Sequence, residues 1–215
     1  MRKSKLGVAL LAAFALMAVS ASGAQATNFT AASYTALISG EQASASSTSF
    51  GFENSTTAKC VTIGVAGELT AASSSLTLSP GYTECTAFGF SEATITPNEC
   101  TFVLKATSGS VDTFSGTGEI KCPEGKKIVV VGGNCETKIG SQSIGTVSYK
   151  VNTAATPDEV EATLSSTTLS YEKSKDGSGC PLTGTGSKTN GTFSGTLKLK
   201  AGKKEGLEPI NMGMS

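Results

Sequence analysis

The residue types that carry most enzyme and metal chemistry are scarce in this chain. It contains no His and no Trp, and its one Arg is Arg2. Mechanisms in which a histidine activates a Ser or Cys nucleophile are therefore excluded. Carboxylates are the remaining candidates for catalytic groups, because glycoside hydrolysis needs only two well-placed Asp or Glu residues. Glu159 and Glu161 form the best pair, since alternate residues of a strand share one face and lie about 6.5–7 Å apart.

Other chemical motifs give weaker signals. Ser170 and Lys173 match the S-x-x-K pattern of penicillin-recognising enzymes, but that motif opens a helix and is accompanied by K-T-G, which this chain lacks. Calcium sites need clustered oxygen ligands, whereas Asp112, Asp158 and Asp176 are far apart. We therefore predict no catalytic, cofactor-binding or metal-binding residues. Solvated carboxylates on a strand face are the expected state of Glu159 and Glu161.

The first 26 residues have the pattern of a secretory signal peptide. A basic start at Arg2, Lys3 and Lys5 precedes an uncharged apolar run, and Ala24-Gln25-Ala26 provides the small-x-small cleavage pattern. The apolar run is too short for a stable membrane span, and no later stretch approaches the required length. The sequence therefore predicts a secreted chain that begins at Thr27 and has no membrane span.

Removal of this leader changes the charge balance. The precursor has 17 Lys plus Arg against 17 Asp plus Glu, so losing three basic residues leaves 14 against 17, a net charge of −3. Nucleic-acid binding depends on clustered Lys and Arg. A mildly acidic chain is a poor candidate for it, so we expect no nucleic-acid partner.

The six cysteines all follow the leader. They are Cys60, Cys85, Cys100, Cys122, Cys135 and Cys180. An even number in an exported chain indicates three disulfides, with about fifteen possible pairings. A faint repeat, in which Thr113–Thr117 recurs as Thr192–Thr196, divides residues 27–215 into two similar halves. This repeat favours the pairings Cys60–Cys85, Cys100–Cys122 and Cys135–Cys180.

Short β-type segments separated by turn residues fill the mature chain. The predicted strands are Tyr34–Ser39, Lys59–Val65, Ser75–Ser79, Ala93–Thr96, Thr101–Ala106, Phe114–Lys121, Lys127–Val131, Thr146–Val151, Val160–Leu164, Thr167–Glu172 and Thr192–Lys200. The continuous apolar run Ile128–Val131 predicts a strand buried on both faces. Asn190-Gly191 predicts a type I′ hairpin turn. We expect one all-β domain over 27–215, an antiparallel β-sandwich or barrel stapled by three disulfides.

Several segments carry a resemblance to a known group. They are Cys60, Ser74–Tyr82, Cys85–Phe90, Cys100–Phe102, Cys122–Ile128, Cys180–Leu182 and Asn190–Phe193. Together these resemble exported, β-rich six-cysteine proteins of high-GC Gram-positive bacteria, over nearly the whole mature chain except Lys198–Ser215. The resemblance implies export, β-structure and disulfides. It assigns no activity and no functional residues.

These observations favour a secreted, disulfide-stabilised, non-catalytic structural or binding protein at the cell surface or in the medium. Cell-envelope polysaccharide and another surface protein are the candidate partners, with Tyr82, Tyr149 and Tyr171 available for stacking on sugars. The alternative is a secreted, glycosidase-like hydrolase that uses Glu159 and Glu161. A concave cleft holding two partly buried carboxylates would favour that alternative.

Overall fold

The computed structural model describes residues 27–45 and 48–215, so the predicted signal peptide lies outside the described residues. The expected all-β class is confirmed. The strands are β1 (Phe29–Ala31), β2 (Ala36–Gln42), β3 (Ser49–Gly51), β4 (Thr57–Leu69), β5 (Ser75–Ala87), β6 (Phe90–Thr96), β7 (Thr101–Ser110), β8 (Thr113–Lys121), β9 (Ile128–Gly132), β10 (Cys135–Ile139), β11 (Gln142–Asn152), β12 (Glu159–Asp176), β13 (Gly186–Lys203), β14 (Pro209–Ile210) and β15 (Met212–Met214). Within the described residues, no helix is long and apolar enough to cross a membrane.

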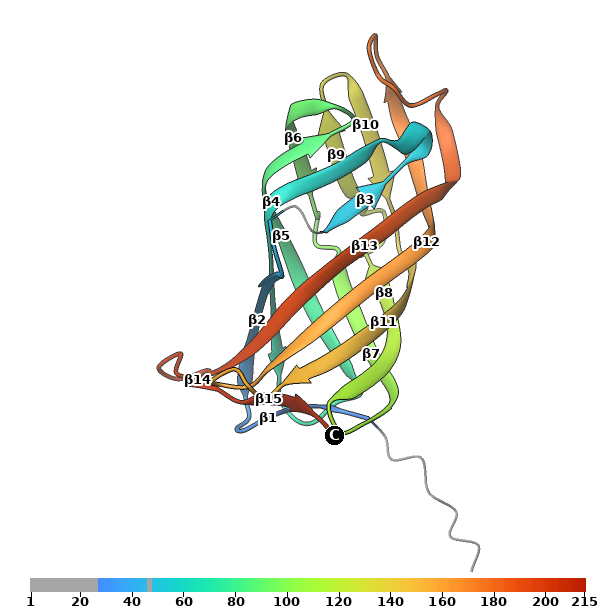
Figure 1. The fold of residues 1–215 in the computed structure, drawn as a ribbon. Coiled ribbons are helices and arrows are strands. Elements are labelled where there is room, and N and C mark those ends of the chain that lie inside the picture. The colour runs from blue at the N-terminus through green and yellow to red at the C-terminus, as the bar shows by residue number, and fades with distance from the viewer. Residues whose placement is uncertain (1–26, 46–47) are drawn as a thin grey trace, which may run out of the picture.

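The main sheet closes on itself (Figure 1). The long strands β4, β5, β12 and β13 belong to two circuits of pairing. The lower circuit in Figure 1 is completed by β2, β7, β8 and β11, and the upper circuit by β3, β6, β9 and β10. The chain is therefore an up-and-down barrel with eight strand positions. At four of these positions two shorter strands replace one long strand, and the chain is interrupted between them: β2 and β3, β7 and β6, β8 and β9, and β11 and β10. We call the level of these interruptions the waist.

Alternate side chains of the strands fill the interior of the barrel. Ile128 and Val130 of β9 are fully buried, whereas Val129 and Val131 are only half-buried. The prediction that this strand is covered on both faces is wrong, because a closed sheet has a single covered face and residues 27–45 and 48–215 form no helical layer outside it. Eight strands leave an interior just wide enough for side chains.

Aromatic side chains form three tiers along the barrel axis. The ring pairs are Phe29–Tyr149, Phe50–Phe193 and Phe52–Tyr171, with centroids 5.3, 4.9 and 4.9 Å apart. All six residues are buried. The Tyr149 hydroxyl donates to the carbonyl oxygen of Lys105 at 3.0 Å. The tyrosines proposed for sugar stacking therefore belong mainly to the core, because Tyr171 and Tyr149 are buried and the Tyr82 hydroxyl is enclosed.

The lower end of the barrel is closed by the two ends of the described chain. β1 and β15 pair with each other across this end (Figure 1). They place Phe29, Met212 and Met214 in the core, each at most 8% exposed. Backbone hydrogen bonds from Asn28 and Phe29 to Ser215 and Ser73 hold this plug in place.

The six cysteines form the three expected disulfides. Cys60 is joined to Cys85, Cys100 to Cys122 and Cys135 to Cys180. Sequential pairing follows from the topology, because strand positions that are consecutive in the chain are neighbours in the barrel. Each closed loop of a few tens of residues stabilises the fold by roughly 3–4 kcal/mol in the chain-entropy model.

The predicted hairpin turn at Asn190-Gly191 is wrong. Both residues lie inside β13, where Gly191 pairs with Leu169 beside a register shift in β12. A Cβ atom on Gly191 would lie 2.7 Å from the Leu169 carbonyl oxygen, so this glycine permits a close approach of two strands. The connection between β12 and β13 falls instead at residues 177–185.

At one interruption at the waist, a side chain supplies the hydrogen bonds that a neighbouring strand would otherwise make. Residues 166–171 of β12 lie between the partner segments provided by β10 and β11. The amide of Gln142 fills this gap: its nitrogen donates to the Ser170 carbonyl at 2.8 Å, and its oxygen accepts from the Ser170 backbone N–H at 2.7 Å. The Gln142 side chain thus takes the place of a missing strand residue.

We expect Gln142→Ala to lower the free energy of unfolding by about 1–2 kcal/mol, because two hydrogen bonds are lost. Ser170→Ala is the matched control, since Ser170 contributes only its backbone to this contact and should change the stability by less than about 0.5 kcal/mol. Urea denaturation of both variants measures the difference. Equal stabilities would contradict the structural role of Gln142.

A carboxylate network joins β10 to β12 in the upper half. Glu136 accepts a hydrogen bond from the Ser174 hydroxyl at 2.6 Å and lies 3.4 Å from the ammonium nitrogens of both Lys138 and Lys175. The Ser174 hydrogen bond, followed by these lysines, holds the pKa of Glu136 below its ordinary value of 4.5. The network therefore stabilises the fold above that pH, and this contribution is lost as the pH falls through the lowered pKa.

Glu136→Gln should remove this acid-sensitive contribution. Between about pH 6 and pH 3, we expect the melting temperature of the native protein to fall further than that of the variant. Glu92→Gln, at an exposed position, is the control and should follow the native curve. Parallel curves for native protein and Glu136→Gln would contradict the assigned network.

Candidate functional site

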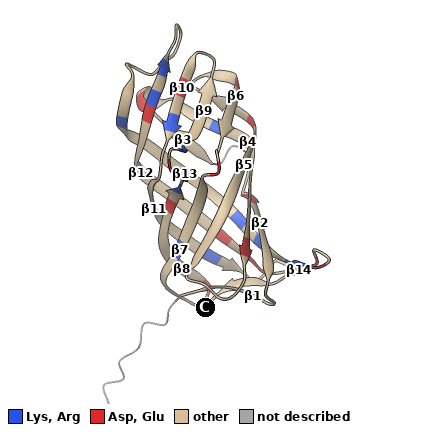
Figure 2. Cartoon of the chain, turned by 180° about the vertical axis from the view of Figure 1, so that it is seen from behind, with Lys and Arg blue, Asp and Glu red and all other residues tan. Residues whose placement is uncertain are grey.

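The charged residues of the strands lie mainly on the outer face of the barrel, with Lys173 as a buried exception. Lys and Glu are interspersed along the strands rather than gathered in one patch (Figure 2). Glu159 and Glu161 both lie on this face, because Val160 and Ala162 between and beside them are fully buried. The structure therefore places the two predicted carboxylates on the same face of β12, as expected from strand geometry.

Their environments nevertheless differ. Glu161 is half-exposed, and its register partners Lys150 and Lys198 flank it on the neighbouring strands. Glu159 is only 8% exposed. The prediction of a solvated strand face is therefore right for Glu161 and wrong for Glu159, because the connection 153–158 at the start of β12 adds a cover that strand periodicity cannot indicate.

Glu159 has two polar contacts. One carboxylate oxygen accepts a hydrogen bond from the Asn152 side-chain amide at 3.1 Å, and the other lies 4.0 Å from the ammonium nitrogen of Lys200. Lys200 is also 3.8 Å from a carboxylate oxygen of Glu41. A buried carboxylate is thus held between one neutral and one cationic donor.

Glu159 lines a groove of about 670 Å³, which we call the Glu159 groove. Its lining residues are Leu37, Ile38, Ser39, Ala66, Gly67, Ala155, Thr156, Pro157, Glu159, Lys200, Ala201, Gly202, Leu207 and Pro209. The floor is formed by β2, β4 and β13. The walls are the 153–158 connection and the hairpin between β13 and β14.

Both walls are fastened to the rest of the molecule. Asp158 donates its backbone N–H to the Asn211 side-chain oxygen at 3.1 Å. In the opposite wall, Lys203 and Glu208 form an ion pair at 2.7 Å, and Lys204 contacts Glu68 at 3.1 Å. The groove is therefore preformed, with a mainly apolar surface and a Glu–Lys pair as its charged groups.

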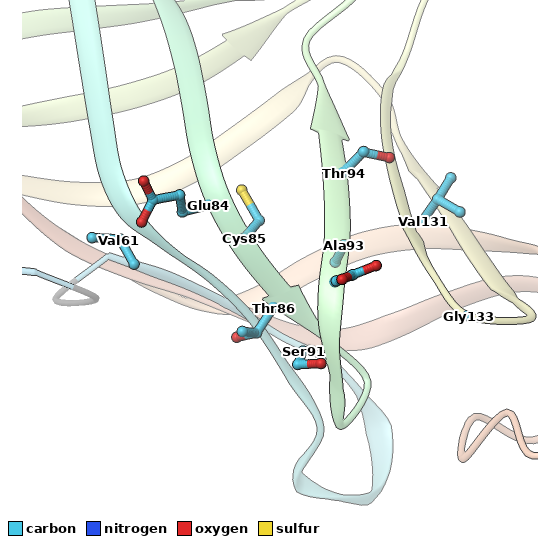
Figure 3. A pocket seen from close by; sticks show the side chains of 10 residues that line it. Val61, Glu84, Cys85, Thr86, Ser91, Ala93, Thr94, Val131 and Gly133 are labelled. Atoms are coloured by element: carbon cyan, nitrogen blue, oxygen red, sulfur yellow. The ribbon is translucent and has the colours of Figure 1, made fainter.

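A second groove, of about 620 Å³, lies on the outer face at the waist. It is lined by residues of β4, β5, β6 and β9 and by Gly133. Figure 3 shows Glu84 beside Val61 on one side and Thr94 beside Val131 on the other. Glu84 and Glu92 both line this second groove, and both are exposed.

Sequence reasoning missed this pair of glutamates. The alternation of buried and exposed residues is reset here: Cys60 and Ile63 of β4 are both buried, and Val61 between them is 45% exposed. Opposite, Glu84 of β5 has a left-handed backbone with φ of +52°. A non-glycine residue in that region is uncommon. The only sequence signal was a charged residue directly before a cysteine in a β-type segment.

The other sequence candidates do not assemble into a site. Ser170 is exposed and Lys173 is buried, so the two residues of the S-x-x-K match lie on opposite faces of β12. Among the described residues, no group of three or more His, Cys, Asp or Glu side chains is arranged to hold a metal ion. The six cysteines are all used in disulfides.

Comparison with family models, with curated proteins and with solved structures finds no match to this chain. The resemblance to exported six-cysteine proteins therefore stays a prediction. Evidence for a function therefore comes from the residues that line the two grooves.

The two glutamates of β12 make a matched experimental pair. We expect Glu159→Ala to lower the free energy of unfolding by about 1–3 kcal/mol, because it removes a covered carboxylate that accepts a hydrogen bond from the half-buried Asn152 amide and lies beside Lys200. Glu161→Ala removes the same charge and should change the stability by less than about 0.5 kcal/mol. Chemical denaturation of both variants at neutral pH measures this difference, and equal effects would contradict the covered position of Glu159.

Proposed function

We propose that this protein is an exported, disulfide-stabilised, non-catalytic binding protein, acting at the cell surface or in the extracellular medium. The observation that carries the proposal is the Glu159 groove. Its volume of about 670 Å³ falls within the range typical of small-molecule sites, which combine apolar walls with a few fixed polar groups.

The chemistry of the groove suits a segment of cell-envelope polysaccharide. Sugar hydroxyls both donate and accept hydrogen bonds, so they complement a carboxylate acceptor and an ammonium donor. Glu159 and Lys200 supply these groups. Leu37, Pro157 and Leu207 offer apolar surfaces for the C–H faces of sugar rings. The groove contains no aromatic platform among its lining residues, which favours modest affinity and binding through repeated contacts along a polymer.

Co-sedimentation of the oxidised, exported protein with purified cell-wall material and insoluble polysaccharides tests this function. We expect saturable binding. Ala66→Trp adds a large side chain to an exposed position in the groove floor and should weaken binding at least about tenfold, the scale of a lost site contact. Thr117→Trp, at an exposed position of β8 remote from the groove lining, should bind like the native protein.

Two results would contradict the proposal. Absence of binding to every preparation would remove polysaccharide as the ligand. Undiminished binding by Ala66→Trp would move the binding site away from the Glu159 groove.

A carboxylate-dependent hydrolase is the second candidate function, and one observation favours testing it. Glu84 and Glu92 line the same groove, whereas Glu161 is outside the lining of the Glu159 groove. Both waist glutamates are exposed, while a general acid in glycoside hydrolysis is usually a carboxyl group shielded from water. Release of reducing sugar that is abolished by Glu84→Gln and Glu92→Gln, and retained by Glu161→Gln, would establish this second function.

A further inference from the structure

Exposed apolar side chains are concentrated at one end of the barrel. In the described part of the chain, the large ones are Tyr34, Val61, Val111 and Leu207, which are 45, 45, 84 and 70% exposed. Val61 lies on β4 at the waist. The other three, which we call the apolar tips, belong to the β1–β2, β7–β8 and β13–β14 connections. These connections are all at the lower end of Figure 1, where β1 and β15 pair.

Two of the apolar tips occupy turn positions that favour other residue types. Val111 and Leu207 have left-handed backbones, with φ of +56° and +54°. Gly, Asn and Asp are the usual residues in such turns, and a β-branched residue there is an outlier. The fold therefore keeps apolar side chains in water at positions where a polar residue would be less strained. Strained residues of this kind are most often found at binding sites.

The rest of the lower end carries little net charge. Three of its connections contain no Lys, Arg, Asp or Glu, namely residues 32–35, 70–74 and 153–157. In the β13–β14 hairpin, Lys203 pairs with Glu208 at 2.7 Å, and Lys204 contacts Glu68 at 3.1 Å. Neighbouring carboxylates thus neutralise both lysines. The surface therefore offers apolar contact and no basic patch.

The described chain also begins and ends at this surface. Thr27 is buried, and Asn28 and Ser215 exchange backbone hydrogen bonds of 2.7 and 3.0 Å. The predicted signal peptide joins the fold at Thr27. A leader held in the membrane would therefore place the lower end, and not the waist or the upper end, next to the bilayer.

We propose that the lower end of the barrel is a lipid-docking surface, which inserts Tyr34, Val111 and Leu207 into the interfacial region of the membrane across which the chain is exported. Tyrosine suits this region because it combines an apolar ring with a polar hydroxyl. Removing Val111 or Leu207 from water strengthens binding by roughly tenfold each. Docking through three side chains is reversible, since even a single myristoyl chain gives only marginal membrane binding.

The chemistry of the surface favours a lipid contact that does not depend on charge. The acidic side chains beside the tips, Asp112 and Glu205, are exposed and would repel anionic lipids. Binding to neutral lipid should therefore be at least as strong as binding to anionic lipid. This surface does not depend on the function proposed for the Glu159 groove, although Leu207 also lines that groove. Its test uses vesicles without polysaccharide, so either proposal can fail alone.

Single tryptophans test the contact directly. The chain contains no Trp, so each introduced Trp reports one position. The oxidised, exported protein carrying Val111→Trp or Leu207→Trp is mixed with vesicles of phosphatidylcholine, alone or with phosphatidylglycerol. We expect the emission of both variants to shift to shorter wavelength with both vesicle types. Val61→Trp, an exposed position at the waist, is the control and should show no shift.

Vesicle co-sedimentation tests whether the native side chains are sufficient. The double variant Val111→Asn/Leu207→Asn introduces a residue that tolerates a left-handed backbone, so its melting temperature should be unchanged or higher. We expect it to bind phosphatidylcholine vesicles at least about tenfold more weakly than the native protein. Val61→Asn is the matched control and should bind like the native protein.

Four results would overturn the lipid-docking surface. The first is an unshifted emission of Val111→Trp and Leu207→Trp with both vesicle types. The second is an equal shift for Val61→Trp, which would show non-specific adsorption. The third is equal vesicle binding by the native protein and the double Asn variant. The fourth is binding confined to vesicles with phosphatidylglycerol, which would show electrostatic attraction without apolar insertion.

Discussion

Closure of the sheet is the constraint on which the rest of the structure depends. It is completed where β13 pairs with β2 and β3. Once eight strand positions form a ring, each strand has one face inside, and the space inside is limited. Gly116 shows how tight the fit is: a Cβ atom there would lie 1.7 Å from the Lys105 carbonyl oxygen. That same carbonyl accepts the Tyr149 hydroxyl. A small residue on β8 thus makes room for a large one on β11.

The waist is where this regular arrangement is interrupted, and two disulfides lie there. Cys100 and Cys122 lie beside the interruptions between β6 and β7 and between β8 and β9. Cys60 and Cys85 are directly opposite each other on β4 and β5, next to the point where the alternation is reset. Covalent links thus lie where the ladder of backbone hydrogen bonds is least continuous, while Gln142 repairs a third interruption without one.

Candidate binding surfaces arise where the chain leaves the barrel. A strand face by itself is convex, and a groove forms only when a connection rises beside it. The 153–158 connection and the β13–β14 hairpin produce the Glu159 groove, and the reset of alternation at the waist produces the second groove. The two ends of the barrel also differ. β1 and β15 pair across one end, whereas at the other end the connection 177–185 is held by side chains such as that of Glu53.

The sequence by itself indicated the all-β class and the shared face of Glu159 and Glu161, because period-two alternation and turn residues act locally. Its faint repeat only favoured the disulfide pairs, which the structure then showed. Sequence-based prediction was wrong where contacts between distant segments of the chain determine the local structure. The Asn190-Gly191 turn became part of β13 because β12 approaches it closely. The closed ring also determines the cover over Glu159, the presence of Glu84 and Glu92 in one groove, and the burial of Lys173. Only the tertiary structure could decide these features, since closure brings together residues that no local pattern connects.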